Sequence, residues 1–285
     1  MSATEIRIDP LTGLRAIIAT GGAATELAVA KPAPAHDRTV DPLLSRDAPD
    51  PPPREDPDLF AALAARGGHE LIAHAPRPVR FLAELTSVEA QAAAELWRVR
   101  MRAHDDAAYV HLSVDEPPGG ADAHAELHAF AFVPAAVARE RERFGAHALR
   151  TMGANLLEDL VQAEVRRRER IVAIDDEAVL WCPYASRHPF ALTLAPRRRR
   201  EHFQDDGATG AALLHHGLTL LRERFGSSPP LSLWVRTAPR GAERFCWHID
   251  VVPRLASPGG LELGTEIACN PVAPERAAAE LRALR

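Results

Sequence analysis

Polar and apolar residues alternate with a period of two over Gly119–Pro134, GGADAHAELHAFAFVP. The side chains that fall on one face are Asp122, His124, Glu126 and His128. Successive side chains of a strand point to opposite faces of its sheet, so this pattern predicts a strand with four ionisable groups on one face. Such a face is most often simply solvated, and it is also where a functional site can lie. Both interpretations stay open on this pattern alone.

The first half of the chain carries further element signals. Residues 5–20 alternate on both sides of a turn at Asp9–Gly13, which predicts a strand pair. Residues 31–58 contain eight prolines, so we expect a long irregular crossing there. Strands are expected from His69 onward and over residues 108–116.

A helix is predicted between these two strands. Thr86 and Glu89 have the spacing of a capping box, which favours a helix over residues 87–106. Its apolar stripe is expected to consist of Ala92, Leu96 and Val99. A further helix is expected around residues 155–170.

The second half repeats the order of strand, helix and strand pair. Strands are expected within residues 177–196, 231–239 and 244–253, and a helix over residues 209–226 that ends at Gly226. In each half the last strand has a histidine two residues before an acid: His124 before Glu126, and His248 before Asp250. We therefore predict an α+β protein made of a duplicated unit, with units at 1–170 and 171–285.

Composition excludes several classes of function. The net charge of −5 provides no footprint for nucleic acid, and the arginine runs at 166–170 and 197–200 are expected to be solvated. The sequence contains no apolar run long enough for a membrane span, and its polar start does not resemble a signal peptide, so we expect a cytoplasmic protein. Lys31 is the single lysine, which argues against a phosphate loop or Schiff-base chemistry.

The cysteines indicate no covalent framework. Cys182, Cys246 and Cys269 are odd in number and far apart, so neither a disulfide set nor a zinc knuckle is predicted. We expect all three to be buried free thiols.

Four further segments are distinctive: DPLTGLRAIIAT, LHAFAFVP, VLWCPYASRHPFALTLAPRR and FCWHIDVVPRLASPGGLELGTEIACNPVAPE. Together they resemble the galactose-1-phosphate uridylyltransferase family of the histidine-triad superfamily. The resemblance covers nearly the whole chain. It implies two tandem histidine-triad-like units whose antiparallel sheets form a half-barrel with helices packed outside. It also implies transfer of a uridylyl group between hexose 1-phosphates through a covalent nucleotidyl-histidine.

The family nucleophile is the second histidine of a His-Pro-His-x-Gln strand, and alignment places His124 at that position. Asp122 stands at the first histidine, and Glu126 stands at the glutamine that donates a hydrogen bond to the phosphoryl oxygen. A carboxylate donates only when it is protonated. Glu126 would therefore repel a phosphate, by roughly 1–4 kcal/mol at about 4 Å, or would act as an acid–base group in changed chemistry.

The resemblance also implies that the family zinc site is lost. The positions of its four ligands hold Asp41, Leu44, Pro78 and Asp122. Leucine and proline side chains cannot ligate zinc, so no metal cofactor is expected. Arg236 stands where some relatives place a histidine ligand of a second metal, and we expect no metal there either.

The remaining matches concern substrate contacts. Asp58 and Phe60 stand at a nucleotide contact of the family, and Glu262 stands at a residue that contacts the hexose. His248 matches the last histidine of a His-x-His strand. With Arg236, Asp122 and His128, these residues are the candidate substrate-binding groups, and His124 and Glu126 are the candidate catalytic ones.

We therefore predict a divergent nucleotidyltransferase that acts on a nucleotide sugar or sugar phosphate, with altered substrate or chemistry. The alternative is a lapsed homologue that binds a nucleotide, a sugar phosphate or a protein partner without turnover. The family commonly pairs two chains, so a homodimer is expected by analogy.

Overall fold

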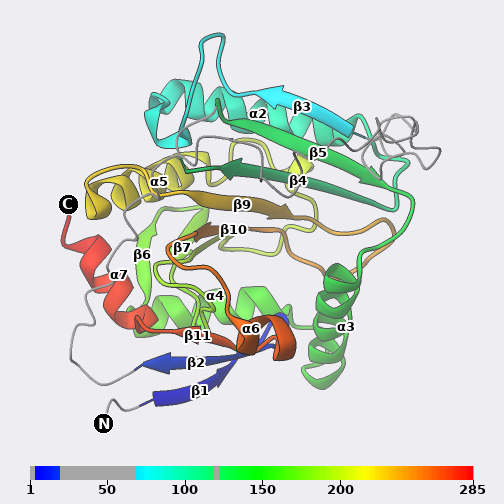
Figure 1. Cartoon of the computed structure of the whole chain (residues 1–285). Coiled ribbons are helices and arrows are strands. Elements are labelled where there is room, and N and C mark those ends of the chain that lie inside the picture. The colour runs from blue at the N-terminus through cyan, green and yellow to red at the C-terminus, as the bar shows by residue number, and fades with distance from the viewer. Residues whose placement is uncertain (1–3, 20–68, 119–121, 285) are drawn as a thin grey trace, which may run out of the picture.

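The computed structural model describes residues 4–19, 69–118 and 122–284, which form two sheets and six helices (Figure 1). The large antiparallel sheet contains, in spatial order, β3 (His69–Ala73), β5 (His124–Phe130), β4 (Tyr109–Glu116), β9 (Leu231–Arg236), β10 (His248–Pro253), β8 (Leu192–Pro196), β7 (Ala178–Trp181) and β6 (Ile171–Ile174). The small sheet contains β1 (Thr4–Ile8), β2 (Arg15–Ala19) and β11 (Ala268–Asn270). The large sheet is open at both ends, so the described strands form no closed barrel.

The large sheet has matching halves on the two sides of its central β4–β9 pair. On one side β5 and β3 follow, and on the other β10 and β8 follow. The strands that carry His124 and His248 therefore occupy matching places in one continuous sheet. The predicted α+β class, with an antiparallel half-barrel, is confirmed, while the division at residues 170 and 171 stays a prediction.

One face of the large sheet is covered by α2 (Ser87–Arg102), α5 (Ala211–Phe225) and α7 (Pro274–Arg282). Alternate residues of the strands, among them Leu112, Leu127 and Leu233, share a core with apolar side chains of these helices. Each such side chain contributes about 1.5–3 kcal/mol when it is fully buried. This face therefore supplies much of the stability, and the opposite face can carry polar groups.

Among the described residues, helices cover the opposite face at its β6–β8 end. There α3 (Ala135–Arg150) and α4 (Leu156–Arg167) form a second core that includes Phe144, Leu157, Trp181 and Phe245. The sequence analysis did not predict α3, whose buried residues are Val137, Glu140, Phe144 and Ala148. Asn155 caps α4 by accepting hydrogen bonds from two backbone amides.

Local signals at the ends of helices are confirmed. Thr86 and Glu89 form both hydrogen bonds of the predicted capping box at α2. Gly226 ends α5 with a φ of 71°, a left-handed conformation that glycine adopts without steric cost.

The predicted stripe of α2 was wrong. Leu96 and Val99 are 40% and 44% exposed, and the buried residues of this helix are Ala93, Ala94, Trp97, Arg98 and Met101. This alanine-rich helix is apolar on several sides, so its inward face was set by the large Trp97 and by Arg98. The guanidinium of Arg98 donates to the carbonyl oxygens of Phe203 and Thr209, which satisfies it inside the protein.

Two further expectations were wrong in part. Arg170, from the first arginine run, is only 3% exposed, and it forms ion pairs of 2.8 Å with Glu164 and 2.7 Å with Glu275. Cys182 and Cys246 are buried free thiols as expected, but Cys269 is exposed. Its position on the short outer strand β11 explains this, because one face of that strand meets solvent.

No helix of the described ranges is long and apolar enough to cross a bilayer.

Candidate functional site

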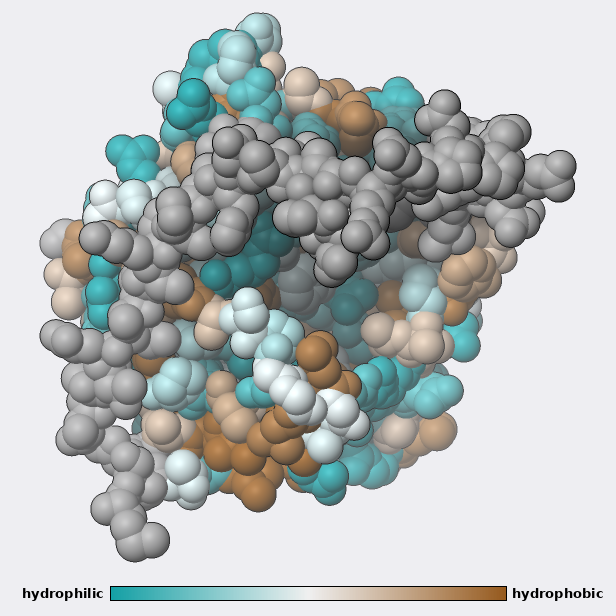
Figure 2. Space-filling view, in the orientation of Figure 1, coloured by the Kyte–Doolittle hydropathy of each residue, from teal (hydrophilic) through white to brown (hydrophobic). Residues whose placement is uncertain are grey.

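The strand register aligns polar side chains in two rows on the face opposite α2 and α5. In the first row His128 pairs with both His69 and His111, and farther along Arg236 pairs with His248. In the second row Glu126 pairs with Ser113, Ser113 with Trp234, Trp234 with Asp250, and Asp250 with Thr193. We call this surface the polar face, and Figure 2 shows hydrophilic surface in the hollow at the centre of the molecule.

One end of the polar face carries a group that we call the histidine cluster: His69, His124, Glu126 and His128. Oε2 of Glu126 lies 3.4 Å from Nε2 of His128 and 4.0 Å from Nε2 of His69. Oε1 of the same carboxylate lies 3.6 Å from Nε2 of His124. The rings of His69 and His128 are stacked, with centroids 4.6 Å apart and planes inclined by 10°. The carboxylate of Glu126 thus lies among three imidazoles.

Burial keeps part of this region uncharged. The pKa of His128 is lowered, first by burial and then by the neighbouring His69. Burial also lowers the pKa of His111 to about 4. A histidine with a lowered pKa is neutral near pH 7, so its ring nitrogens act as one donor and one acceptor.

His124 is the most accessible histidine of this cluster, with 44% of its side chain exposed. Its Nδ1 lies 3.2 Å from the carbonyl oxygen of Asp122, an exposed residue just before β5. Nδ1–H donates to that oxygen in the tautomer that this contact favours, which leaves the lone pair of Nε2 free. His248 has the same arrangement in the other half, with Nδ1 at 3.3 Å from the carbonyl oxygen of Cys246.

A second group joins β9, β10 and α3. Glu140 projects from α3, with Oε1 3.4 Å from Nε of Arg236 and Oε2 4.0 Å from Nε2 of His248. Burial raises the pKa of Glu140, and the charges of Arg236 and His248 oppose that rise. Asp250 lies 3.9 Å from Nε2 of His248 and accepts a 2.9 Å hydrogen bond from Thr193.

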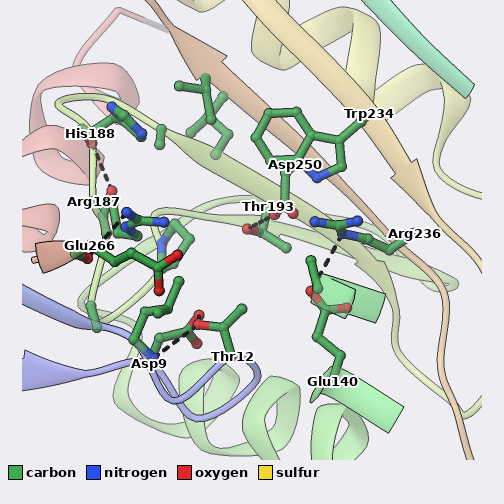
Figure 3. Close-up of a pocket in the computed structure, with 18 of the residues that line it drawn as sticks. Asp9, Thr12, Glu140, Arg187, His188, Thr193, Trp234, Arg236, Asp250 and Glu266 are labelled. Atoms are coloured by element: carbon green, nitrogen blue, oxygen red, sulfur yellow. Dashed lines mark hydrogen bonds and ion pairs between the residues drawn. The ribbon is translucent and has the colours of Figure 1, made fainter. Parts of the chain in front are cut away.

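A cavity of about 310 Å³ opens beside this second group (Figure 3). Its lining includes Asp9, Thr12, Glu140, Arg187, His188, Thr193, Trp234, Arg236, Asp250 and Glu266. Figure 3 shows Glu140 and Arg236 directed toward each other across one end of it. Burial raises the pKa of Asp9, whose carboxylate accepts hydrogen bonds from the Thr12 hydroxyl and the Leu11 amide. The cavity therefore combines hydroxyl, carboxyl and guanidinium groups with one indole.

The structure brings some of the expected site residues together and separates others. His124, Glu126 and His128 share the histidine cluster, and Arg236 and His248 share the second group. Glu262 lies in α6 (Gly260–Thr265), where its carboxylate accepts a 2.9 Å hydrogen bond from the amide of Gly259 and caps its own helix. Asp58 and Phe60, and the zinc-site positions Asp41 and Leu44, lie outside the described residues.

Sequence reasoning missed several residues of the site. His69 was noted only as the start of a strand, and Asp9, Glu140, Thr193 and Trp234 were not selected. They come from separate segments, and no local pattern links them. The one local signal was Asp250, which follows His248 by two residues and therefore had to share its face.

Known proteins resemble this chain over most of its length. The galactose-1-phosphate uridylyltransferase of Haemophilus influenzae is 29% identical over 217 residues, which cover 72% of this chain and 61% of that protein. The galactose-1-phosphate uridylyltransferase of Rattus norvegicus is 28% identical over 268 residues, which cover 85% of this chain and 69% of that protein. The chain thus spans about three fifths of the Haemophilus protein, and no family model matches it.

A solved structure has the same fold. The ADP-glucose phosphorylase of Arabidopsis thaliana, determined with bound ADP-glucose, matches with a TM-score of 0.72 and 19% identity over 98% of this chain and 99% of that one. The described residues therefore share the open, antiparallel α+β fold of that structure. The chain is therefore similar to the galactose-1-phosphate uridylyltransferases, as a divergent relative.

Proposed function

We propose that this chain is a nucleotidyltransferase that acts on a nucleotide sugar or sugar phosphate, with His124 as its nucleophile. The observation that carries the proposal is the hydrogen bond between Nδ1 of His124 and the carbonyl oxygen of Asp122. It favours the tautomer in which Nε2 has a free lone pair, on a side chain that is 44% exposed.

The chemistry is a pair of displacements at phosphorus. Nε2 of His124 attacks the α-phosphorus of a nucleotide sugar, a nitrogen–phosphorus bond forms, and the bond to the leaving sugar 1-phosphate breaks with its electron pair on the departing oxygen. A second phosphate then attacks the nucleotidyl-histidine and regenerates the free imidazole. Glu126, 3.6 Å from Nε2, is the group best placed to orient or deprotonate a reacting group.

The relatives support the substrate class. Curated relatives are galactose-1-phosphate uridylyltransferases and an ADP-glucose phosphorylase, and one solved neighbour holds ADP-glucose. The cavity of about 310 Å³ is at the lower end of the range for small-molecule sites, about 300–1,000 Å³. We assign it to part of the substrate, with Arg236 in its lining and the buried His248 behind it, 3.9 Å from Asp250. Asp122 and His128 would contact the substrate near His124, and Asp58, Phe60 and Glu262 remain candidate contacts.

Binding without turnover is the competing function. Glu126 stands where the family resemblance places a neutral hydrogen-bond donor, and Arg236 is already paired with the buried Glu140. A phosphate would thus meet one carboxylate and one partly neutralised guanidinium. This arrangement favours weak phosphate binding. The experiment must therefore also distinguish a homologue that binds a ligand without turnover.

The test begins with a thermal-shift screen of nucleotide sugars and sugar phosphates, because a ligand that binds the native state raises the melting temperature. Intact masses are then measured for wild type, His124→Asn and His147→Asn incubated with each stabilising nucleotide sugar. His147 lies on α3, paired with Asp159 at 2.7 Å, and serves as the control. We expect a nucleotidyl adduct in wild type and in His147→Asn, and none in His124→Asn. Stabilisation without adduct or turnover would establish the binder instead.

A further inference from the structure

We infer that His69, Glu126 and His128 bind one divalent transition-metal ion of the zinc type. The three side chains come from two neighbouring strands, and the register pairs His69 of β3 directly with His128 of β5. Each offers one ligand atom, and the three ligand atoms lie within 4.8 Å of one another. This site is separate from the four positions at which the family zinc ligands are replaced.

The spacing of the ligand atoms fits a tetrahedral ion. Metal bonds of about 2.0–2.2 Å place tetrahedral ligand atoms roughly 3.3–3.6 Å apart. Oε2 of Glu126 lies 3.4 Å from Nε2 of His128 and 4.0 Å from Nε2 of His69. The three ligand atoms lie within 4.8 Å of one another, so the two histidine nitrogens would have to approach each other by up to roughly 1 Å. His69 lies at the end of the edge strand β3, which leaves it room to move.

The environment of His69 also points to a ligand. Its Nε2 is fully buried and forms no hydrogen bond with any described residue. A buried ring nitrogen without a partner costs free energy, and a metal ion in the cluster would supply that partner. The two histidine rings are stacked, with planes inclined by 10°, so one ring must rotate about its Cβ–Cγ bond before both nitrogens point at a single ion.

The donor set indicates the kind of metal. Two imidazole nitrogens and one carboxylate oxygen suit Zn²⁺ and neighbouring transition metals, whereas Mg²⁺ and Ca²⁺ prefer oxygen ligands alone. Three protein ligands leave a fourth position open. Glu126 is 38% exposed, so solvent reaches the carboxylate that would hold the ion.

The ion would change the role of Glu126. Its Oε2 would ligate the metal while Oε1 still faces His124, and the positive charge would offset the repulsion between this carboxylate and a phosphate. This last consequence rests on the proposed function. The metal site itself rests only on the geometry of the three side chains.

The experiment titrates Zn²⁺ alone into full-length protein that has been treated with chelator and dialysed, with calorimetry for affinity and Co²⁺ absorption for coordination. We expect one site in wild type. Removal of a residue that only supports a ligand costs about 10–100-fold in affinity, so His69→Ala and Glu126→Gln should each weaken binding by at least about 100-fold. Both side chains are partly exposed, so these variants should fold, and melting curves of the metal-free proteins check this.

The matched control is His147→Asn, which removes a histidine from another histidine–carboxylate pair, 2.7 Å apart. It should bind Zn²⁺ as wild type does. Absence of a stoichiometric site in wild type, or equal affinity in wild type, His69→Ala and Glu126→Gln, would overturn the proposal. Because no substrate is present, this outcome is independent of whether the chain transfers a nucleotide.

Discussion

Nε2 of His124 lies 3.6 Å from Oε1 of Glu126, and both side chains project from the same face of β5. The contact follows directly from their spacing of two residues along the strand. It places a carboxylate beside the imidazole proposed to attack phosphorus, at the position where the family resemblance implies a neutral donor.

We predict that Glu126→Gln lowers the rate of nucleotidyl transfer by about 10²–10⁴-fold, because the amide can neither accept a proton nor serve as a metal ligand of comparable strength. Single-turnover rates with a nucleotide sugar that passes the binding screen measure the change. A faster variant would show instead that Glu126 mainly repels the phosphate.

His69→Ala separates the two possible roles of Glu126. This variant loses a proposed metal ligand but keeps Glu126 beside His124. If the metal alone explains the effect, His69→Ala and Glu126→Gln should lose activity equally. If Glu126 also moves a proton, Glu126→Gln should be the slower of the two at saturating Zn²⁺.

Arg236 is expected to stabilise the fold by compensating the buried Glu140, 3.4 Å away. Arg236→Met removes the guanidinium partner and leaves His248, 4.0 Å away, as the remaining basic neighbour of that carboxylate. Loss of one partner of a buried ion pair costs about 3–5 kcal/mol. Burial already raises the pKa of Glu140. Without the guanidinium the carboxyl group takes up a proton more readily, so the stability deficit should shrink as the pH falls.

Urea unfolding at about pH 8 and about pH 5 measures this dependence. The double variant Arg236→Met, Glu140→Gln should recover most of the lost free energy of unfolding, because no buried charge then remains. A deficit that is independent of pH and unrelieved by the second substitution would contradict the assignment.

Glu116 should make the protein less stable as the pH rises. It is 1% exposed, accepts a hydrogen bond from the amide of Leu82, and has a pKa raised by burial from 4.5 to about 7. A raised pKa means that the folded state binds the proton more tightly than the unfolded state. Stability is therefore lost between about pH 4.5 and about pH 7, on the order of 3 kcal/mol.

Glu116→Gln keeps an oxygen for Leu82 and removes the titration. We expect this variant to have a higher free energy of unfolding than wild type at about pH 8, and a smaller change between about pH 5 and about pH 8. Parallel pH profiles for the two proteins would show that the buried carboxyl group does not titrate in this range.

Gly210 should be intolerant of a side chain, whereas Gly145 should accept one. Gly210 has a φ of 79°, and a Cβ there would lie 2.8 Å from Cδ2 of Leu194. We expect Gly210→Ala to destabilise by about 1–3 kcal/mol. A Cβ at Gly145, inside α3, meets nothing within 4 Å, so Gly145→Ala should stabilise by about 0.5–1 kcal/mol. Thermal melts of the pair measure both effects, and equal shifts would refute the distinction.

The amino-acid sequence by itself determined the main strands, the residues on each of their faces, and the ends of two helices. Alternation was enough to predict β5 and β10 and to place His124 and His248 beside an acid, because side-chain direction along a strand depends only on residue spacing. The capping box at Thr86 and the end of α5 at Gly226 were also predictable, because a helix cap involves only residues within one turn of the helix.

Only the tertiary structure decided which distant residues meet. The approach of His69 to Glu126 and His128 depends on the β3–β5 register, and the approach of Glu140 to Arg236 depends on how α3 docks on the sheet. The buried side of α2 likewise depends on the segments that pack against it, and the burial of Arg170 depends on its ion pair with Glu275. These choices follow from packing between segments far apart in the chain, and a single sequence specifies no partner for a polar group until those segments are brought together.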